Sequence, residues 1–292
     1  MITPPIDVSF EFFPPTTEQG RTNLLSCATD LAVFDPSFMS VTYGAGGTSQ
    51  DRTLVALADL VDSVDVPIAG HLTTVNASAR EIHEVVDAYS TLGVTHIVAL
   101  RGDPPPDAPR RPSAYETAAD LVAAIRNRPD GGRFQISVAA YPEVHPKASS
   151  PQADLDNLKR KIDAGADRAL TQFFFDPDVF CRFVDDARAA GIDAPIVPGI
   201  MPVTNFEGIT RFAERCGATI PDWMVGLLAG LDDDPDVRQL VSATIAAEQC
   251  RRLAERGVDE FHFYTMNRRH LPAATCRTLG LRAGATAVGA ER

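Results

Sequence analysis

Cysteine is scarce in this sequence, and its few cysteines are far apart. There are five, and the two closest, Cys250 and Cys276, are separated by 26 positions. An odd number at such spacing fits neither a disulfide framework nor a zinc site. We therefore predict reduced cysteines and a cytoplasmic protein. The others are Cys27, Cys181 and Cys216.

Long apolar runs and clusters of basic residues are also missing. No segment approaches the 18 or so apolar residues of a membrane span, and residues 1–5 (MITPP) lack the basic region of a signal peptide. The formal net charge is -12, whereas binding to a nucleic acid backbone requires clustered Lys and Arg. We predict a protein that is neither exported nor membrane-embedded and that binds no nucleic acid.

What the sequence does contain is a repeating pattern of short apolar runs rich in Val, Ile and Phe. Eight such runs alternate with amphipathic stretches of helical character. This alternation predicts parallel strands joined by right-handed crossovers, and eight units close into a single α/β domain, a (β/α)8 TIM barrel. The runs lie at 6–12, 38–43, 66–72, 95–100, 135–141, 168–174, 195–201 and 259–264, and helices are expected at 53–63, 79–92, 118–126, 152–164 and 179–190.

Three segments depart from the even repeat. The proline-rich loop 103–112 excludes a helix or central strand and predicts an exposed flap. The connection between the seventh and eighth strands is about twice the usual length and predicts helices near 205–216, 221–230 and 236–256, with the aspartates at 232–234 capping the last one. Residues 283–292 are weakly patterned, so we expect a barrel domain over 1–282 and a flexible tail.

Polar side chains stand where the predicted strands end. In a TIM barrel the C-terminal ends of the strands carry the chemistry, so these side chains are expected to share one polar cleft. A single His or Gln at a strand end is more often a satisfied loop residue, and only the set as a whole predicts a site. Its members are Glu11, Thr42, His71, Arg101 with Asp103, Tyr141 with His145, Gln172, and Tyr264.

Glu11 is the most informative of these residues, since three phenylalanines and two prolines surround it in 9–15 (SFEFFPP). Such a setting predicts desolvation, a raised pKa and a general acid that works near neutral pH. The alternative is a structural ion pair with an arginine at a strand end. The local spacing does not choose between the two.

Nine segments carry a resemblance to a known family. In chain order they resemble methylenetetrahydrofolate reductase, in the bacterial form that consists of the catalytic domain only. The segments are 9–15 (SFEFFPP), 40–53 (SVTYGAGGTSQDRT), 71–73 (HLT), 98–103 (VALRGD), 137–146 (SVAAYPEVHP), 157–166 (NLKRKIDAGA), 171–176 (TQFFFD), 198–202 (PGIMP) and 262–268 (HFYTMNR).

The resemblance implies a flavoenzyme on a (β/α)8 barrel. It would reduce 5,10-methylenetetrahydrofolate to 5-methyltetrahydrofolate with NADH or NADPH, through bound FAD, and so supply methyl groups for methionine synthesis. The choice between NADH and NADPH stays open, a homo-oligomer is left open, and the sequence identifies no interface.

The resemblance also assigns roles to residues of the substrate site. Glu11 would be the general acid that opens the imidazolidine ring, and Asp103 the carboxylate beside flavin and pterin. Gln172 and Tyr264 would bind folate, Phe212 would stack near the nicotinamide and substrate, and Arg268 would hold the folate's glutamate carboxylate. No metal is implied.

For FAD, the resemblance supplies a larger set of residues. Arg101 and Lys161 would meet the pyrophosphate, and Gly102 would allow close backbone approach. No GxGxxG fingerprint is present, and the glycines of 44–47 are interpreted as a plain loop. The full set is Thr42, His71, Leu100, Arg101, Gly102, Asp103, Ala118, Tyr141, His145, Asp154, Asn157 and Lys161.

Two positions depart from the family pattern. Thr117 replaces a tyrosine that contacts flavin, for which Tyr115 is a candidate substitute, and Gly208 replaces a common glutamine. These changes leave open direct hydride transfer from the nicotinamide without flavin.

Two further alternatives come from other classes. One is a metal-dependent hydrolase or lyase that uses His71, His145, Glu11 and Asp103, although no HxH pair supports it. The other is a barrel that binds folate or flavin without turnover.

Overall fold

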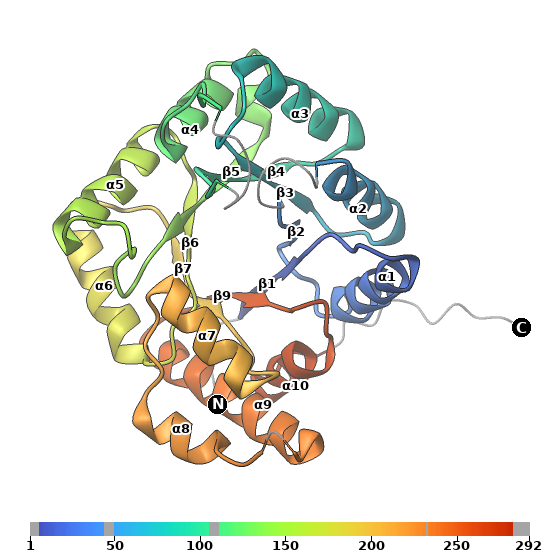
Figure 1. Cartoon of the computed structure of the whole chain (residues 1–292), viewed down its shortest axis with the longest axis vertical. Coiled ribbons are helices and arrows are strands. Elements are labelled where there is room, and N and C mark those ends of the chain that lie inside the picture. Colours follow the sequence, from blue (N-terminus) through green and yellow to red (C-terminus); the bar gives the residue numbers. More distant parts are fainter. Residues whose placement is uncertain (1–5, 44–49, 105–110, 232, 283–292) are drawn as a thin grey trace, which may run out of the picture.

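The computed structural model describes residues 6–43, 50–104, 111–231 and 233–282. Nine short parallel strands form one sheet in the order β7-β6-β5-β4-β3-β2-β1-β9-β8. The first strand pairs with β9, and Figure 1 shows the sheet curled into a nearly closed barrel within a ring of helices. The predicted barrel is thus confirmed. The strands are β1 (Asp7–Phe12), β2 (Phe38–Val41), β3 (Ile68–Thr73), β4 (His96–Leu100), β5 (Gln135–Ala140), β6 (Arg168–Thr171), β7 (Ile196–Val197), β8 (Gly199–Ile200) and β9 (Glu260–Tyr264).

The helices follow the strands in alternation, as the pattern predicts for the units up to β7. N-terminal caps mark several of their starts. Ser78, for example, accepts a hydrogen bond from the Glu81 amide, and the Glu81 side chain returns one to the Ser78 amide. The helices are α1 (Glu18–Ala32), α2 (Gln50–Ser63), α3 (Ala79–Leu92), α4 (Ala118–Arg126), α5 (Pro151–Asp163), α6 (Pro177–Ala189), α7 (Phe206–Cys216), α8 (Asp222–Leu228), α9 (Pro235–Ala254) and α10 (His270–Thr278), with a short 3-10 turn η1 (Gly131–Arg133).

The seventh predicted strand is divided in two by Pro198. Its first part, β7, pairs with β6, and its second part, β8, pairs with β9. Proline has no amide hydrogen and cannot donate to a ladder, but the Pro198 carbonyl accepts from the His262 amide at 3.0 Å. One interrupted segment therefore spans the gap between β6 and β9 and brings the barrel close to closure.

The sixth strand, β6, ends at Thr171 and is thus shorter than the predicted run 168–174. The following phenylalanines are buried, but they serve two different cores. Phe174 stacks on Phe180 of α6 with ring centroids 5.2 Å apart, while Phe173 packs against Phe212 of α7 at 5.2 Å. An apolar run is thus a sign of burial, and here the burial is outside the sheet.

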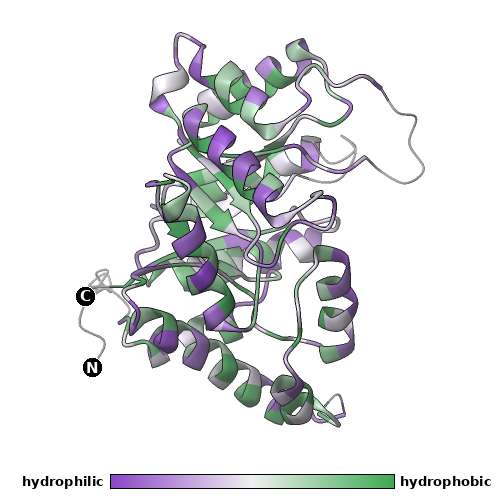
Figure 2. Ribbon diagram, turned by 90° about the vertical axis from the view of Figure 1, so that its left-hand side faces the viewer, coloured by the Kyte–Doolittle hydropathy of each residue, from purple (hydrophilic) through white to green (hydrophobic). Residues whose placement is uncertain are grey.

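The hydrophobic core has three parts. The largest lies between the strands and the helices, and Figure 2 shows the apolar strands inside a more polar ring of helices. A small second cluster fills the barrel interior, and a third lies beneath α7 and α8. The interior cluster consists of Phe38, Ala69, Val98, Leu170 and Val197.

The long connection after β8 forms the helices α7, α8 and α9, as the sequence predicts (Figure 1). Asp234 caps α9 by accepting from the Val237 amide at 3.2 Å, so the predicted capping role is confirmed for this aspartate. Within the described ranges, no helix has the length and apolar character needed to cross a membrane. The loop at 44–47, most of the proline-rich flap and the predicted tail at 283–292 lie outside the described residues.

Candidate active site

Two adjacent cavities open at the C-terminal ends of the strands. The central cavity has a volume of about 410 Å³ and contains Glu11 and His71. The lateral cavity has a volume of about 490 Å³ and lies between the β4 and β5 ends and helices α4 and α5. Leu100, Ala139 and Tyr141 line both cavities. A molecule that occupies the lateral cavity can therefore meet one that occupies the central cavity.

Two imidazoles meet the Glu11 carboxylate in the central cavity. His71 Nε2, on β3, lies 3.2 Å from Glu11 Oε2, and His262 Nε2, on β9, lies 3.4 Å from the same oxygen. Parallel pairing explains the meeting, because β1 lies next to β9 and only one strand away from β3. Glu11 is thus paired with histidines, and the expected alternative of an arginine partner is wrong.

These contacts reverse the expected direction of the pKa shift of Glu11. Burial raises the pKa of the carboxyl, as the aromatic surroundings predict, but His71 and His262 together outweigh burial and hold it at about 2, against a usual 4.5. The prediction of a raised pKa is therefore wrong. Glu11 is ionised at neutral pH.

The two imidazoles are themselves fixed by buried partners. Ser9 Oγ lies 2.8 Å from His262 Nδ1, and donation from the hydroxyl would keep the other nitrogen, Nε2, protonated toward Glu11. The His262 ring also stacks on Phe38, with centroids 5.6 Å apart.

A buried tyrosine, Tyr89, supports His71 through the backbone. The Tyr89 hydroxyl donates to the His71 carbonyl at 2.6 Å. The Tyr89 ring fills the space beside Gly70, where an added Cβ would lie 2.5 Å from the ring. Gly70 is therefore required for the close packing that holds His71 in place.

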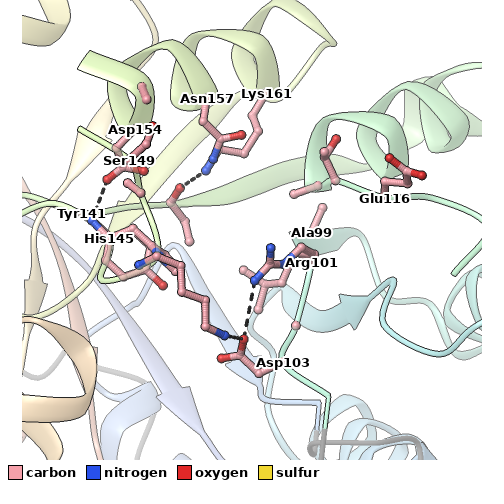
Figure 3. Close-up of a pocket in the computed structure, with 18 residues that line it drawn as sticks. Ala99, Arg101, Asp103, Glu116, Tyr141, His145, Ser149, Asp154, Asn157 and Lys161 are labelled. Atoms are coloured by element: carbon pink, nitrogen blue, oxygen red, sulfur yellow. Dashed lines mark hydrogen bonds and ion pairs between the residues drawn. The ribbon is translucent and has the colours of Figure 1, made fainter. Parts of the chain in front are cut away.

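The lateral cavity contains the second predicted catalytic carboxylate, Asp103. Figure 3 shows Asp103 beneath Arg101, and their charged groups lie 3.6 Å apart. Lys147, from the loop after β5, also forms an ion pair with Asp103. The hydrogen bond from Lys147 is the main cause that lowers the pKa of Asp103. Burial acts in the opposite direction, and the charges of Lys147 and Arg101 add to the lowering.

Lys161 lies deeper in the lateral cavity and is almost fully buried. Its ammonium donates to the Ala139 carbonyl. Burial lowers the pKa of Lys161 to about 8, although Asp154 acts in the opposite direction. Asp154 also accepts from the His145 amide at 2.8 Å and so ties the loop after β5 to α5 (Figure 3).

The structure brings the predicted residues together, but divides them among three cavities. Of the predicted FAD residues, all line the lateral cavity except Thr42 and His71, which line the central one. Of the predicted substrate residues, Asp103 lines the lateral cavity and Arg268 lines a third cavity beside α10. The remaining four, Glu11, Gln172, Phe212 and Tyr264, line the central cavity.

The polar groups of two of these residues are already engaged within the protein. The Tyr264 hydroxyl donates to the Thr171 carbonyl at 2.6 Å, and Gln172 Oε1 accepts from the Phe173 amide at 2.9 Å. Tyr264 therefore offers its ring to the cavity, while Gln172 keeps its amide nitrogen available for a ligand.

The positions that depart from the family pattern have local structural roles. Thr117 lines the lateral cavity and caps α4 by accepting from the Asp120 amide. Tyr115 is directed to α3, where its hydroxyl lies 3.4 Å from His83 Nε2. Tyr115 is not among the residues of the lateral cavity, so it does not replace the missing tyrosine. The Gly208 amide donates to the Asn205 cap of α7 at 2.6 Å.

The structure explains the glycine at position 102 differently from the expectation. Its φ of 77° lies in the left-handed region. A Cβ there would approach the Thr73 side chain to 2.9 Å. The glycine is therefore required by packing between β3 and the loop after β4, and approach of a ligand is not needed to explain it.

The alternative of a metal-dependent hydrolase or lyase requires four residues to meet around one metal ion. Glu11 and His71 lie in the central cavity, whereas Asp103 and His145 lie in the lateral one. In the described part of the chain, no three His, Cys, Asp or Glu side chains form a group that could hold a metal ion.

Sequence reasoning missed three residues of the site: Ser9, His262 and Lys147. Ser9 and His262 were detectable by alternation, since residues two apart in a strand face the same side. Ser9 precedes Glu11 by two positions, and His262 precedes Tyr264 by two. Lys147 carries no such signal, because it lies in a loop.

A nearly closed parallel barrel with polar cavities at its C-terminal rim defines a TIM-barrel enzyme. The profile of the methylenetetrahydrofolate reductase family matches residues 4–280. The chain belongs to this family of oxidoreductases of folate metabolism.

Individual relatives agree with this assignment. The 5,10-methylenetetrahydrofolate reductase of Escherichia coli (strain K12) is 48% identical over 279 residues, which cover 96% of this chain and 92% of that one. Methylenetetrahydrofolate reductase (NADH) 1 of Arabidopsis thaliana is 38% identical over 271 residues, covering 89% of this chain and 46% of that one. A solved structure from Clostridium thermocellum, of an uncharacterized protein that binds two copies of 5-methyl-5,6,7,8-tetrahydrofolic acid, shares the fold with a TM-score of 0.64 at 14% identity, covering 94% of this chain and 96% of that one.

Proposed function

We propose that this protein reduces 5,10-methylenetetrahydrofolate to 5-methyltetrahydrofolate with NADH or NADPH, and that FAD binds in the lateral cavity. The observation that carries the proposal is the largely buried Glu11, with two imidazoles at one carboxylate oxygen, in a cavity that adjoins a second one lined by cations. The product would supply methyl groups for methionine synthesis in the cytoplasm.

The residues of the lateral cavity fit a flavin dinucleotide. Arg101 and the buried Lys161 would neutralise the pyrophosphate, since a buried lysine that forms no ion pair with any described residue gains most from an anion. Leu100 and Tyr141, shared by both cavities, would place the flavin ring at their junction. FAD, when bound, would supply the transfer of two electrons between nicotinamide and folate.

The proton for ring opening passes through Glu11. A folate in the central cavity excludes water from the carboxylate and raises the pKa of Glu11, so a proton moves from an imidazole Nε2 to Oε2. Glu11 then protonates N10 of the imidazolidine ring. The bond from N10 to the methylene carbon breaks, the electron pair stays on N10, and N5 and the methylene carbon form the iminium that accepts hydride.

The histidines complete the proton path, because they recharge Glu11 after each turnover. Ser9 keeps His262 in the tautomer with its proton on Nε2. Asp103, which lines the adjoining lateral cavity, would stabilise the positive charge that develops on the opened ring.

The central cavity also has room for a planar ligand against apolar walls. Phe212, Met201 and Tyr264 line it, and the Arg215 guanidinium lies 5.5 Å from the centre of the Phe212 ring. These surfaces would receive the pterin and, in the other half-reaction, the nicotinamide.

A spectral experiment tests the proposal. The purified protein, loaded with FAD and freed of excess cofactor, is expected to lose its flavin absorbance with NADH or NADPH and regain it with 5,10-methylenetetrahydrofolate. A protein that holds no FAD yet still oxidises NADH with this substrate would establish direct transfer. Absence of any folate-dependent oxidation of both nucleotides would refute the proposal.

A further inference from the structure

Ser40 on β2 is fully buried, and its hydroxyl is not used in the fold. Its exposed fraction is 0%, and within the described ranges Ser40 Oγ has no hydrogen-bond partner. Burial removes the hydrogen bonds that water makes with this hydroxyl in the unfolded chain, so an unpaired Oγ lowers the stability of the fold. The reason for a serine at this position therefore lies elsewhere than in the stability of the resting fold.

Ser40 faces the barrel interior, directly beneath the central cavity. Side chains two apart in a strand face the same side of the sheet. Phe38, two residues before Ser40, belongs to the interior cluster, and Thr42, two residues after it, lines the central cavity. Ser40 also pairs with Glu11 of β1 in the register of the sheet. The unused hydroxyl therefore lies inside the barrel at the level of Glu11.

The contact between Glu11 and His71 crosses β2 next to Ser40. Figure 1 shows β2 between β1 and β3. Ser40 pairs with Glu11 on one side and, on the other, with Ala69, two residues before His71. His71 Nε2 nevertheless reaches to within 3.2 Å of Glu11 Oε2. The small side chain of Ser40 leaves room for this contact and places a hydroxyl beside it.

The two imidazoles at Glu11 differ in their partners. His262 is hydrogen-bonded at both ring nitrogens, to Ser9 through Nδ1 and to Glu11 through Nε2. His71 Nε2 is buried, but it is not aligned for a hydrogen bond with Glu11 or with any other described residue. Two buried polar atoms without a hydrogen bond, Ser40 Oγ and His71 Nε2, thus lie on neighbouring strands at one carboxylate. They are complementary, because a hydroxyl can donate to an imidazole nitrogen that has lost its proton.

We propose that Ser40 is a positioning residue for proton transfer to Glu11, and that its hydroxyl donates to His71 Nε2 after this nitrogen has passed its proton on. This rests on the proposed function. The N–H bond at His71 Nε2 breaks, its electron pair stays on the nitrogen, and an O–H bond forms at Glu11 Oε2. Ser40 keeps its own proton and turns it toward the bare nitrogen. The new hydrogen bond stabilises the state in which Glu11 carries the proton for N10, and His71 regains a proton from water once the product has left.

The test is Ser40→Ala, which keeps the space beside Glu11 but removes the hydroxyl. In stopped flow, reduction of 5,10-methylenetetrahydrofolate by the FAD-loaded and previously reduced protein should slow on the order of tenfold. Reduction of the flavin by NADH or NADPH and the KM for the folate should stay within about twofold. Because Glu11 is harder to protonate in the variant, the rate of the folate half-reaction should begin to fall at a lower pH as the pH is raised. The groups that face this point and share the titration are Glu11 on β1, His71 on β3 and His262 on β9.

Ser242→Ala is the matched control. Ser242 on α9 is 1% exposed, and its Oγ likewise has no hydrogen-bond partner in the described part of the chain. Both variants remove an unpaired buried hydroxyl, so neither should lower the melting temperature, but only Ser40→Ala should change the folate half-reaction. Ser40→Cys, whose thiol is a weak donor of similar size, should give a rate between those of Ser40→Ala and the wild type.

Three outcomes would overturn the proposal and leave the reductase function intact. An unchanged rate and pH profile in Ser40→Ala would show that the hydroxyl takes no part in proton transfer. An equal loss in both half-reactions, or the same loss in Ser242→Ala, would assign the effect to the structure in general. A clearly lowered melting temperature of Ser40→Ala would show that the hydroxyl has a partner in the resting fold. Failure of the wild type to reduce the folate would instead refute the reductase function itself.

Discussion

Glu11 and Asp103 are both carboxylates at the C-terminal ends of barrel strands, yet their surroundings differ sharply. The Glu11 side chain is 16% exposed and meets two imidazoles fixed on neighbouring strands. The Asp103 side chain is 66% exposed and meets Lys147, whose own side chain is 57% exposed. Both carboxyls have a lowered pKa, but Glu11 is held by buried side chains of neighbouring strands and Asp103 by exposed side chains.

A change in charge is expected to have different consequences at the two carboxylates. Around Glu11 the side chains are largely buried and solvent compensates poorly for a lost partner, so each group at Glu11 is energetically coupled to the others. At the rim of the lateral cavity, solvent and salt screen the charges, and an exposed ion pair contributes little. We therefore expect large effects of substitutions around Glu11 and small ones around the partner of Asp103.

The largest effect is expected for Glu11→Gln. The amide keeps the shape of the side chain but cannot donate a carboxylic proton to N10, so reduction of the folate should slow on the order of a thousandfold. Reduction of the bound flavin by NADH or NADPH should be spared. Stopped-flow measurement of each half-reaction checks this. An equal loss in both half-reactions would mean that Glu11 is not the general acid.

The same variant tests the lowered pKa of Glu11. In the folded protein the pKa is about 2, against a usual 4.5. The ionised carboxylate therefore stabilises the fold above pH 4.5, and this contribution is lost as the pH falls from 4.5 toward 2. The free energy of unfolding of Glu11→Gln should depend less steeply on pH in this window than that of the wild type. Urea denaturation at a series of pH values measures this dependence. If the free energy of unfolding changed equally with pH in both proteins, the two histidines would not hold the charge of Glu11.

The next largest effect concerns Lys161, a buried cation on the lateral side. Because burial lowers the pKa of Lys161 from 10.5 to about 8, the unfolded chain binds more protons between these pH values, and stability should rise with pH across that window. Below pH 8 the buried ammonium costs stability. Lys161→Met should thus raise the free energy of unfolding at pH 7 by about 2 kcal/mol.

The gain in stability should be accompanied by a loss of cofactor binding. Without the Lys161 charge, we expect FAD affinity to fall about tenfold or more, which a fluorescence titration measures. Lys159→Met is the control, since Lys159 lies on the same helix but is exposed and pairs with Asp163. A destabilised Lys161→Met variant with unchanged FAD affinity would contradict both expectations.

The fold was predictable to the extent that it depends on local patterns. Alternating strands and helices identify the barrel, because each unit buries its own apolar face. The division of the seventh strand at Pro198 was not predicted, since it depends on which strands lie on either side. The burial of Phe173 beneath α7 was not predicted for the same reason.

The site was predictable in its members but not in its electrostatics. Position at a strand end identifies Glu11, His71 and Tyr141 without any tertiary information. The pKa of Glu11 depends instead on His262, which is 251 positions away in sequence. The neighbouring residues in the sequence correctly indicate desolvation, which raises the pKa of Glu11. The distant imidazoles outweigh this effect and lower the pKa.

A smaller effect is expected for Ser9→Ala, which leaves Glu11 and both imidazoles in place. Loss of the Ser9 hydroxyl frees His262 Nδ1 to carry the proton and turns a bare Nε2 toward Glu11. Folate reduction should slow about tenfold, the value of one buried hydrogen bond. The pH profile of that half-reaction should also shift. Ser37→Ala, which removes a hydroxyl bonded to the Val8 carbonyl, should change neither quantity.

The smallest effect is expected for Lys147→Gln, and it decides whether the two carboxylates really differ. Loss of the hydrogen bond from Lys147 should let the pKa of Asp103 rise toward its usual 3.8, which NMR titration of labelled aspartates can follow. The free energy of unfolding should change by less than about 0.5 kcal/mol. Added salt should bring the wild type closer to the variant, because exposed charges are screened. If Lys147→Gln instead slowed folate reduction as much as Ser9→Ala and salt had no effect, Asp103 would be held as rigidly as Glu11, and solvent exposure would not separate the two sites.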